Sequence, residues 1–421
     1  MLTKEENDRL CRVGPGTPMG ELMRRYWHPI AGEAELDADP VKAVRILSED
    51  LVLYRDKGGR LGLLGAQCAH RKASLEYGIP EAEGLRCCYH GWLYAADGRC
   101  IDQPAEPPES NFKDKILHTA YPVEALGGLI FAYMGPRPAP LLPRYDVFAW
   151  DDAWRDVGMV EVPCNWLQCM ENSVDLTHVD HLHGHYFDYV LQKQGHPPRG
   201  SNRAFNGALH LKIGFDVFEH GIVKRRIVEG GDENSETWRE GSNPILFPNM
   251  TRAGGRGSLQ IRVPIDDEHT LNVMYSCYRP DDGKPVPPQE RVPVYRTPLT
   301  EPSGKFKTDW ITGQDIMVWA TQGPMMDRSD EKLGASDQGI IFYRKVLLEQ
   351  IEVMERGDDP LAVIRDPARN VLIEIKKERG PAGSASSMDH HWQQFSPIYA
   401  EAKQLMERSW DGTPRHRGGE D

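Results

Sequence analysis

Two short Cys/His pairs place the strongest constraint on how this chain can fold. The first pair is Cys68 and His70, and the second is Cys87 and His90. Thiolates and imidazoles are common ligands of transition metals in proteins. Because the two pairs lie apart in the sequence, a fold that uses all four side chains must bring two loops together. The chain is therefore predicted to contain a metal site built on two loop tips.

The order of the ligands distinguishes between the metal groups that this set could hold. A Rieske [2Fe–2S] centre has two cysteines on one iron and two histidines on the other. A zinc finger usually groups its cysteines in one pair and its histidines in another. Each pair in this chain contains one of each, which favours the Rieske centre. The alternatives are a zinc site, or buried free cysteines beside a packed histidine.

The two half-motifs also resemble those of a known family. Cys68-x-His70 and Cys87-x-x-His90-Gly91-Trp92 resemble the Rieske motif of the ring-hydroxylating oxygenases. This resemblance selects Cys87 over the adjacent Cys88, because Cys-x-x-His is the second half of the family motif. Cys88 is then expected to be a small packed residue.

Further segments resemble the phthalate dioxygenase branch of that family. They are the segments 2–7, 14–20, 25–29, 322–324 and 327–328. The resemblance covers the chain from its start to about residue 345. It implies the catalytic (alpha) subunit of a Rieske non-heme iron oxygenase that forms homotrimers or hexamers without a partner β subunit. It also implies a separate ferredoxin or reductase that supplies electrons from NAD(P)H. The absence of a Gly-x-Gly-x-x-Gly fingerprint agrees with an external reductase.

Proline-rich joints divide the chain into three expected parts. Residues 1–40 are expected to be an N-terminal helical segment that packs with the catalytic domain. Residues 41–136 contain short apolar strands and an Asp97-Gly98 hairpin turn, which predict a small all-β domain. The prolines between 136 and 143 mark the next boundary. Residues 137–421 are expected to form the larger domain.

Period-two alternation in the larger domain predicts an antiparallel sheet with one buried face. The apolar series runs through residues 209–217 and again through 259–265. Helical spacing is found at 340–355 and 396–408, and the proline-rich stretch 279–305 is expected to be a surface excursion or subunit arm. The predicted fold class is therefore α+β. The family resemblance implies that the sheet is flanked by helices in a helix-grip arrangement.

A second metal site is indicated by the segment 171–183, which is crowded with donor side chains. A mononuclear Fe(II) oxygenase needs two histidines and one carboxylate on one face of the metal. On a regular helix His178 and His181 share a face, whereas His178 and His183 lie about 140° apart. His178 and His183 can converge only if the helix ends or unwinds between them. Spacing alone leaves the choice open.

The family resemblance selects the second pair. Asp175-x-x-His178-x4-His183 resembles the family motif in which both histidines bind iron, so His181 is expected to be a non-ligand. Gln314-Asp315-Ile316-Met317 resembles the segment that carries the iron aspartate. Asp315 is therefore expected to be the third ligand. Asp327 is the second candidate, although it is expected to pair with Arg328.

Asp175 and Asn172 have a different expected role. Asp175 lies three residues before His178 and could orient that histidine through a hydrogen bond. The resemblance implies more, because the matching aspartate links the mononuclear iron to a Rieske histidine of the neighbouring subunit. Asn172 would lie beside that path. The alternative is a local helix cap formed by Asp175.

Charge and composition exclude several other classes of partner. The net charge is −13, and no basic stripe indicates binding of nucleic acid. The charged start is unlike a signal peptide, and no apolar run is long enough to suggest a membrane span. Eight cysteines in 421 residues do not indicate a disulfide framework, which favours a reducing cytoplasm.

The expected cofactors are therefore a Rieske [2Fe–2S] cluster and mononuclear Fe(II), with O2 as co-substrate. The expected substrate is a small aromatic compound, an aromatic carboxylate in particular, and the reaction is hydroxylation, dihydroxylation or O-demethylation. A carboxylate would be bound well by a buried arginine. Five basic residues are candidates, each of which could instead belong to a solvated strand face: Lys224, Arg225, Arg226, Arg252 and Arg262.

Other functional classes are left open by the residues alone. A Rieske-type electron-transfer protein would not need the second site. A zinc-dependent hydrolase could use His178, His183 and Asp315 but would not need a cluster. A non-catalytic iron-binding scaffold is the third alternative.

Overall fold

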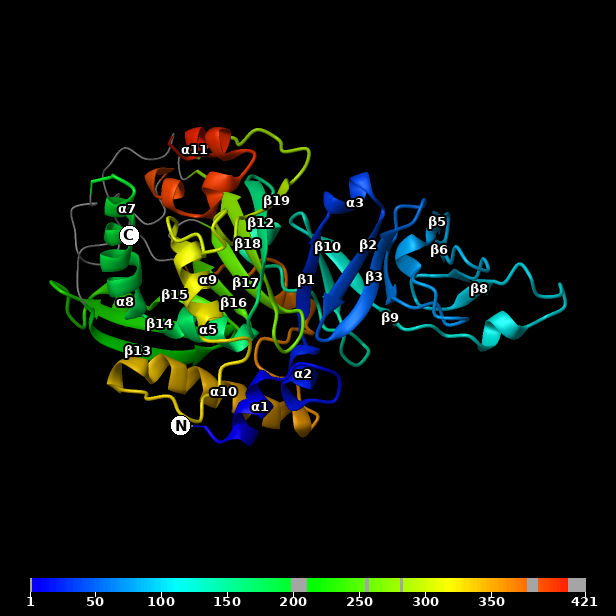
Figure 1. The fold of residues 1–421 in the computed structure, drawn as a ribbon, viewed down its shortest axis with the longest axis horizontal. Helices are drawn as coiled ribbons and strands as arrows, with labels where there is room; N and C mark the ends of the chain where they lie inside the picture. Colours follow the sequence, from blue (N-terminus) through cyan, green and yellow to red (C-terminus); the bar gives the residue numbers. More distant parts are fainter. Residues whose placement is uncertain (1, 198–209, 254–256, 281–282, 377–384, 408–421) are drawn as a thin grey trace.

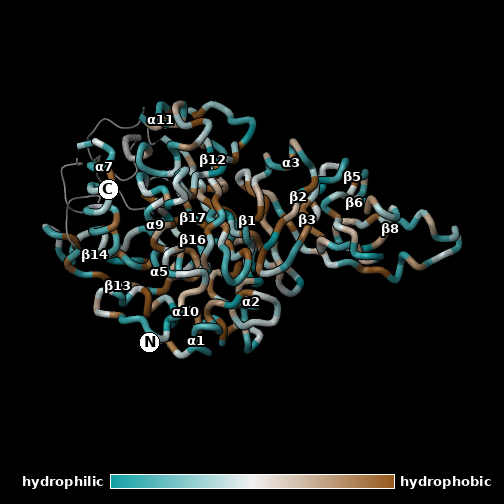
Figure 2. Tube along the Cα trace, in the orientation of Figure 1, coloured by the Kyte–Doolittle hydropathy of each residue, from teal (hydrophilic) through white to brown (hydrophobic). Residues whose placement is uncertain are grey.

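The structure is a computed structural model that describes residues 2–197, 210–253, 257–280, 283–376 and 385–407. Figure 1 shows two lobes side by side along the longest axis. The smaller lobe is formed by the blue and cyan part of the chain, and the larger lobe by the rest together with the N-terminal helices. In the tube of Figure 2, hydrophilic segments lie around the outside of both lobes. Among the described residues, no helix combines the length and apolar character needed to cross a membrane.

The smaller lobe contains two antiparallel sheets of four short strands each. The first has the order β2 (Val41–Ile46), β3 (Glu49–Arg55), β4 (Leu61–Gly65) and β9 (Ala120–Tyr121). The second has the order β5 (Ile79–Glu81), β6 (Gly84–Arg86), β7 (Leu93–Tyr94) and β8 (Cys100–Asp102). The expected hairpin at Asp97-Gly98 joins β7 to β8, with Gly98 at φ +89°. One-turn helices η1 (Leu75–Tyr77) and η2 (Phe112–Lys115) complete the lobe.

A three-stranded sheet connects the N-terminal segment to the end of the smaller lobe. Its order is β1 (Trp27–Gly32), β11 (Leu129–Tyr133) and β10 (Val123–Leu126). The segment expected to be helical therefore also holds a strand, besides α1 (Lys4–Cys11), α2 (Pro18–Met23) and α3 (Glu35–Ala38). Helix α2 ends at Met23, and the chain then continues into β1.

The larger lobe is built on one eight-stranded sheet, which confirms the predicted α+β class. Its strand order is β13 (His210–Phe218), β14 (Gly221–Val228), β15 (Ser242–Leu246), β16 (Met250–Ala253), β17 (Ser258–Pro264), β18 (Thr270–Tyr278), β12 (Trp154–Val162) and β19 (Val294–Arg296). All neighbours are antiparallel except β12 and β19. The proline-rich stretch 279–305 thus supplies an edge strand in addition to surface chain.

The helices of the larger lobe form two groups. One group holds the functional segments, and the other includes the helix that packs against the sheet. The functional segments are α5 (Trp166–Val174), α6 (His178–Asp180), η3 (His181–Tyr186), α7 (Phe187–Lys193) and α9 (Ile311–Thr321). The long α10 (Gln338–Glu355) packs against α5, α2 and β13, and it confirms the predicted helix at 340–355. Shorter helices are α4 (Asp146–Ala149), α8 (Glu236–Arg239), η4 (Ala335–Asp337), η5 (Pro367–Arg369), η7 (Ala385–His390), η8 (Trp392–Phe395) and α11 (Tyr399–Glu407).

The expectation of a sheet with one buried face is wrong in two places. The edge strand β13 is more exposed than expected, and the central strand β17 is buried on both faces. Leu211 and Val217 on the edge strand β13 are 62% and 49% exposed. In contrast, every residue of β17 is buried, including the polar residues that alternate with its apolar ones. The polar face of the central strands is therefore covered by protein. This covered polar face adjoins the site described next.

Candidate active site

The two Cys/His pairs lie on two loops with the same backbone hydrogen bonds. The carbonyl oxygen of Cys68 accepts a bond of 2.9 Å from the N–H of Lys72, and that of Cys87 accepts one of 3.1 Å from Gly91. Lys72 and Gly91 both have positive φ, +62° and +76°. Each loop follows a strand, β4 and β6 respectively, so the sheets hold the two tips in place.

The two cysteines are buried, and the two histidines lie on the outer side. Cys68 and Cys87 are 1% and 2% exposed, whereas His70 is exposed and His90 is half-buried. The imidazole centroids of His70 and His90 are 4.5 Å apart. Trp92 stacks on His70 with its ring centroid at 4.6 Å, which orients that imidazole.

The thiols of the inner pair favour a bound cation. Burial and the adjacent Cys68 thiol raise the pKa of Cys87, although backbone N–H groups of the loop favour its thiolate. A metal group bound to both sulfurs would offset the free-energy cost of ionising the buried thiols, because metal coordination deprotonates thiols. Cys88 is exposed, contrary to its expected packing. Two buried thiols and two outer imidazoles are the donor set that would hold a Rieske [2Fe–2S] cluster.

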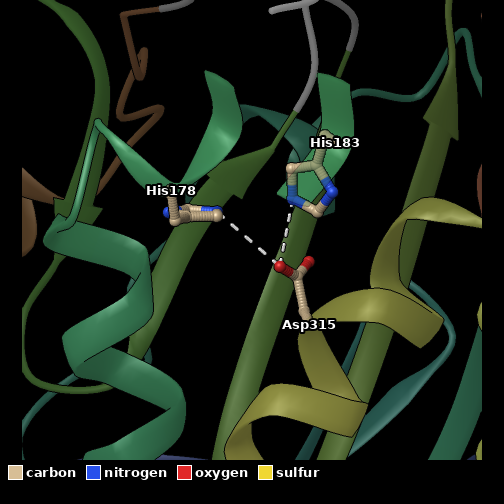
Figure 3. A group of neighbouring side chains, drawn as sticks. All are labelled: His178, His183 and Asp315. Atoms are coloured by element: carbon tan, nitrogen blue, oxygen red, sulfur yellow. Dashed lines mark ion pairs between the residues drawn. The ribbon is translucent and has the colours of Figure 1, made fainter. Parts of the chain in front are cut away.

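The second site brings His178, His183 and Asp315 together (Figure 3). One ligand atom from each lies within 4.8 Å of the others. Nε2 of His183 is 3.1 Å from Oδ1 of Asp315, and Nε2 of His178 is 3.7 Å from the same oxygen. Figure 3 shows the three side chains converging from two separate helical segments, with strands of the large sheet behind them. Two imidazoles and one carboxylate form the donor set that suits a mononuclear Fe(II) with open positions.

A π-helix explains how histidines five residues apart converge. The helix neither ends nor unwinds between His178 and His183, although their spacing predicted that it would. Instead α6 continues directly into η3, a π-helix over His181–Tyr186. Its i→i+5 hydrogen bonds widen the turn that holds His183, directly after the turn that holds His178, so the angle between the two side chains differs from that on a regular α-helix. His181 and His185 stack on each other on the exposed side, with centroids 5.1 Å apart, and are not in the group.

Hydrogen bonds at Nδ1 fix both imidazoles so that Nε2 points toward Asp315. Nδ1 of His178 lies 2.6 Å from the backbone oxygen of Asp175. Nδ1 of His183 lies 2.8 Å from Oε1 of Gln314. Such outer partners set the tautomer and orientation of metal-binding histidines. The role of Gln314 was missed in the sequence analysis, and its position directly before Asp315 was the only available signal.

The carboxyl group of Asp315 is prepared to carry a negative charge despite being buried. Burial alone would disfavour ionisation, but His183, His178 and Arg262 outweigh it and hold the pKa of Asp315 below its usual range. Burial, followed by the neighbouring His183, lowers the pKa of His178. A carboxylate beside neutral imidazoles is the protonation state that metal coordination requires.

Asp327 does not belong to this group, and its expected pairing with Arg328 is wrong. Its carboxylate is exposed and accepts a hydrogen bond of 2.9 Å from the N–H of Ser329. Arg328 instead points inward and binds Glu171, with Nη2 2.7 Å from Oε2. A buried carboxylate is a stronger partner for the buried guanidinium than an exposed neighbour in sequence.

Asp175 and Asn172 border an open cleft next to His178. Oδ1 of Asp175 accepts bonds of 2.8 Å from both the N–H and the hydroxyl of Thr177, so this oxygen caps the following turn. Oδ2 lies 3.8 Å from Nδ1 of His178. One carboxylate oxygen is thus used locally, and the other is turned toward the histidine.

Four of the five basic candidates have partners within the protein. Arg225 binds Asp216 and two backbone oxygens, and Lys224 donates to the backbone oxygen of Ser173. Arg226 lies beside His210, and Arg252 binds Asp146. Arg262 is the fifth candidate. The alternative of a solvated strand face is wrong for Arg252 and Arg262, which are 1% and 2% exposed.

Comparisons with known proteins show which family the chain is similar to. Residues 26–122 match the Rieske [2Fe-2S] domain family, and residues 303–374 match the family described as LigXa C-terminal domain like. The chain is 44% identical over 379 residues to the 5,5'-dehydrodivanillate O-demethylase oxygenase subunit of Sphingobium sp. (strain NBRC 103272 / SYK-6), covering 89% of this chain and 86% of the relative. It is 34% identical over 400 residues to the phthalate 4,5-dioxygenase oxygenase subunit of Pseudomonas putida, covering 86% and 89%. The fold is also similar to that of Pseudomonas putida CBB5 NdmA, with a TM-score of 0.59 at 20% identity over 86% of this chain and 99% of that one.

These findings define an oxygenase with a Rieske domain of β strands and a larger antiparallel-sheet domain with helices. The chain belongs to the Rieske non-heme iron oxygenases, as the oxygenase component of a multicomponent system. Its cofactors are the Rieske [2Fe–2S] cluster and a mononuclear iron, and O2 is its co-substrate. The resemblance inferred from the Cys/His and His/His motifs is therefore confirmed.

Proposed function

We propose that this oxygenase removes the methyl group of a methoxylated aromatic carboxylate. The relative that is 44% identical over 89% of this chain is an O-demethylase oxygenase subunit acting on such a compound, and this similarity carries the proposal. Cleavage of an aryl methyl ether by one O2, two electrons and two protons yields a phenol, formaldehyde and water. The electrons come from NAD(P)H through a separate ferredoxin or reductase.

The proposed ligands are those that the two sites bring together. Cys68, Cys87, His70 and His90 hold the cluster, and the convergent group of His178, His183 and Asp315 holds the iron. When bound, this iron supplies the position at which O2 is activated. Burial of His183 and Asp315, which are 3% and 6% exposed, supports a site that excludes bulk water on their side.

The proposed assembly is a homotrimer or a hexamer in which electrons pass between subunits. The open cleft beside Asp175 and His178 supports this, because it leaves the outer edge of the iron site accessible to another protein. Asp175 would connect His178 to His90 or His70 of the neighbouring subunit, with Asn172 beside it. The eight free cysteines support a reducing cytoplasm as its location.

Dihydroxylation of an aromatic acid is the second candidate. It is favoured by the 34% identity to the phthalate 4,5-dioxygenase oxygenase subunit over 86% of this chain. Both candidates share the two metal sites and differ in the product released. The ring substituent presented to the iron therefore decides between them.

A product assay with a surrogate reductase tests the proposal. Methoxylated aromatic acids, including 5,5'-dehydrodivanillate, should give formaldehyde and the corresponding phenol in equal amounts. A cis-dihydrodiol without formaldehyde would replace the first candidate by the second. His183→Ala should lose the mononuclear iron and all turnover but keep the visible absorbance of the cluster. Full turnover by that variant would contradict the proposed ligand set.

A further inference from the structure

Arg262 is a buried cation without a carboxylate partner. It is 2% exposed, and its Nε and Nη1 atoms have no hydrogen-bond partner. Among the described residues, no carboxylate lies within ion-pair distance of its guanidinium. Burial lowers its pKa from 12.5 to about 10, so it stays charged at neutral pH. A buried charge of this kind usually has a partner, because removing an ion from water is costly.

Unpaired polar atoms gather around Arg262 on one face of the central sheet. Asn272 lies directly opposite Arg262 across the β17/β18 ladder, and both of its amide atoms lack a partner at 0% exposure. Gln260 lies two residues before Arg262 on the same face, with Oε1 unpaired. Buried polar groups are almost always hydrogen-bonded in native proteins. A cluster of unpaired ones, with a cation at its centre, indicates a place for a polar ligand.

This cluster lies next to the proposed iron site. The guanidinium carbon of Arg262 is 4.9 Å from the ring centroid of Trp319. Trp319 lies four residues after Asp315 on α9, so the two side chains share a helix face about 6 Å apart along the axis. The charge of Arg262 also helps to lower the pKa of Asp315.

We propose that Arg262, with Asn272 beside it, binds the carboxylate of the aromatic substrate and thereby places the methoxyl group at the iron. The inference rests on the proposed function and deepens it, because it assigns the residue that selects acids. Arg262 offers a guanidinium fork that matches the two oxygens of a carboxylate. Asn272 offers an amide N–H to the same group, and Gln260 borders it.

Arg252 on the neighbouring strand shows why Arg262 is distinctive. Both arginines are fully buried in the same sheet, but Arg252 projects from the opposite face and binds Asp146 at 3.1 Å. The fold therefore supplies one buried arginine with a protein carboxylate and leaves the other without one. The arginine without a partner is the one beside the iron site.

Equilibrium binding to the metal-loaded protein tests the proposal without turnover. The probes are 5,5'-dehydrodivanillate and its dimethyl ester, which differ in charge but keep the same rings and methoxyl groups. In Arg262→Gln, the Kd for the acid should rise about 10- to 150-fold, the range for charge-assisted hydrogen bonds. The Kd for the ester should change less than about threefold. Arg225→Gln, which removes an arginine paired to Asp216, should bind both probes as the wild type does.

Asn272→Asp gives a second test that does not leave a buried charge unpaired. The new carboxylate would pair with Arg262 and compete with the substrate, so acid binding should fall while ester binding persists. Cluster absorbance and thermal melting report whether either variant is folded. Equal weakening of acid and ester, or unchanged acid binding in folded Arg262→Gln, would overturn the proposal. Tight acid binding that yields no formaldehyde would instead contradict the proposed function and leave the role of Arg262 intact.

Discussion

Nδ1 of His183 donates a hydrogen bond of 2.8 Å to Oε1 of Gln314, the residue directly before Asp315. One turn of α9 therefore both supplies the carboxylate of the convergent group and orients an imidazole of that group. Nε2 of Gln314 is itself held by the backbone oxygen of Thr308 at 3.0 Å, which fixes the amide. The geometry of the site thus depends on a residue that contributes no ligand atom.

Replacing Gln314 by Ala should weaken iron binding without unfolding the protein. Loss of the acceptor frees the His183 ring to rotate, and such outer partners are worth about 10- to 100-fold in metal affinity. Iron affinity can be measured by competition with a ferrous chelator. Gln192→Ala on the exposed side of α7 is the control. Equal affinities in the two variants would show that Gln314 does not orient the histidine.

The two adjacent cysteines should behave differently because of their burial. Cys87→Ser should abolish the visible absorbance and EPR signal of the cluster. Cys88→Ser should keep both, because Cys88 is exposed while Cys87 is 2% exposed. Loss of the cluster in Cys88→Ser but not in Cys87→Ser would show that Cys88, and not Cys87, is the cluster ligand.

Local spacing revealed the Cys/His pairs and the His-rich segment, whereas the choice of His183 over His181 and of the distant Asp315 depended on the family resemblance. The spacing of Cys68-x-His70 and of His178-x4-His183 is set within single loops or helical segments. The π-helix that joins His178 to His183 could not be predicted, because its widened turn has no distinct residue pattern. Spacing on an ideal α-helix indicated the wrong geometry.

The tertiary partners were the least predictable part. Arg328 was expected to pair with its neighbour Asp327, and a solvated strand face was left open for Arg262, because basic side chains usually face water. Their burial depends on α5 and α9 covering the sheet and on partners far away in the sequence, such as Glu171. The burial predicted for the apolar residues of β13 was wrong for the same reason. Alternation predicts two faces, but not which of them another element covers.

The carboxylate of Glu171 should be essential for stability. It accepts hydrogen bonds from Arg328 and from Arg344, whose Nε lies 2.6 Å away, and these arginines outweigh burial to keep its pKa low. Glu171→Gln leaves the buried guanidinium of Arg328 without a carboxylate partner, whereas Arg344 keeps its pair with Glu331. The free energy of unfolding should fall by about 3–5 kcal/mol in denaturant titrations. Glu161→Gln, on an exposed position of β12, should change it by less than about 0.5 kcal/mol.

Asp156 should make stability depend on pH. Burial raises the pKa of Asp156 to about 6, even though the hydroxyl of Tyr278 donates to it at 2.7 Å. A raised pKa means that the folded state binds the proton more tightly than the unfolded state. The contribution of the protonated Asp156 to folding stability is therefore fully present below pH 3.8 and is lost as the pH rises through about 6. Between pH 5 and 8, wild type should lose about 1 kcal/mol relative to Asp156→Asn. Parallel stability curves for the two proteins would contradict this.

Asp175→Asn should separate metal binding from turnover. Asparagine keeps an oxygen that can accept the bonds from Thr177, so the turn before His178 and the iron affinity should be preserved. The charged oxygen 3.8 Å from Nδ1 of His178 is lost, and with it the proposed connection to the neighbouring subunit. Turnover should fall to about 1% or less, as expected when a reacting group loses its position. Thr177→Val removes only the hydroxyl bond and should keep most of the activity. Stopped-flow oxidation of the reduced cluster by O2 in the presence of substrate measures the step directly, and an unchanged rate in Asp175→Asn would exclude this residue from the path of the electron.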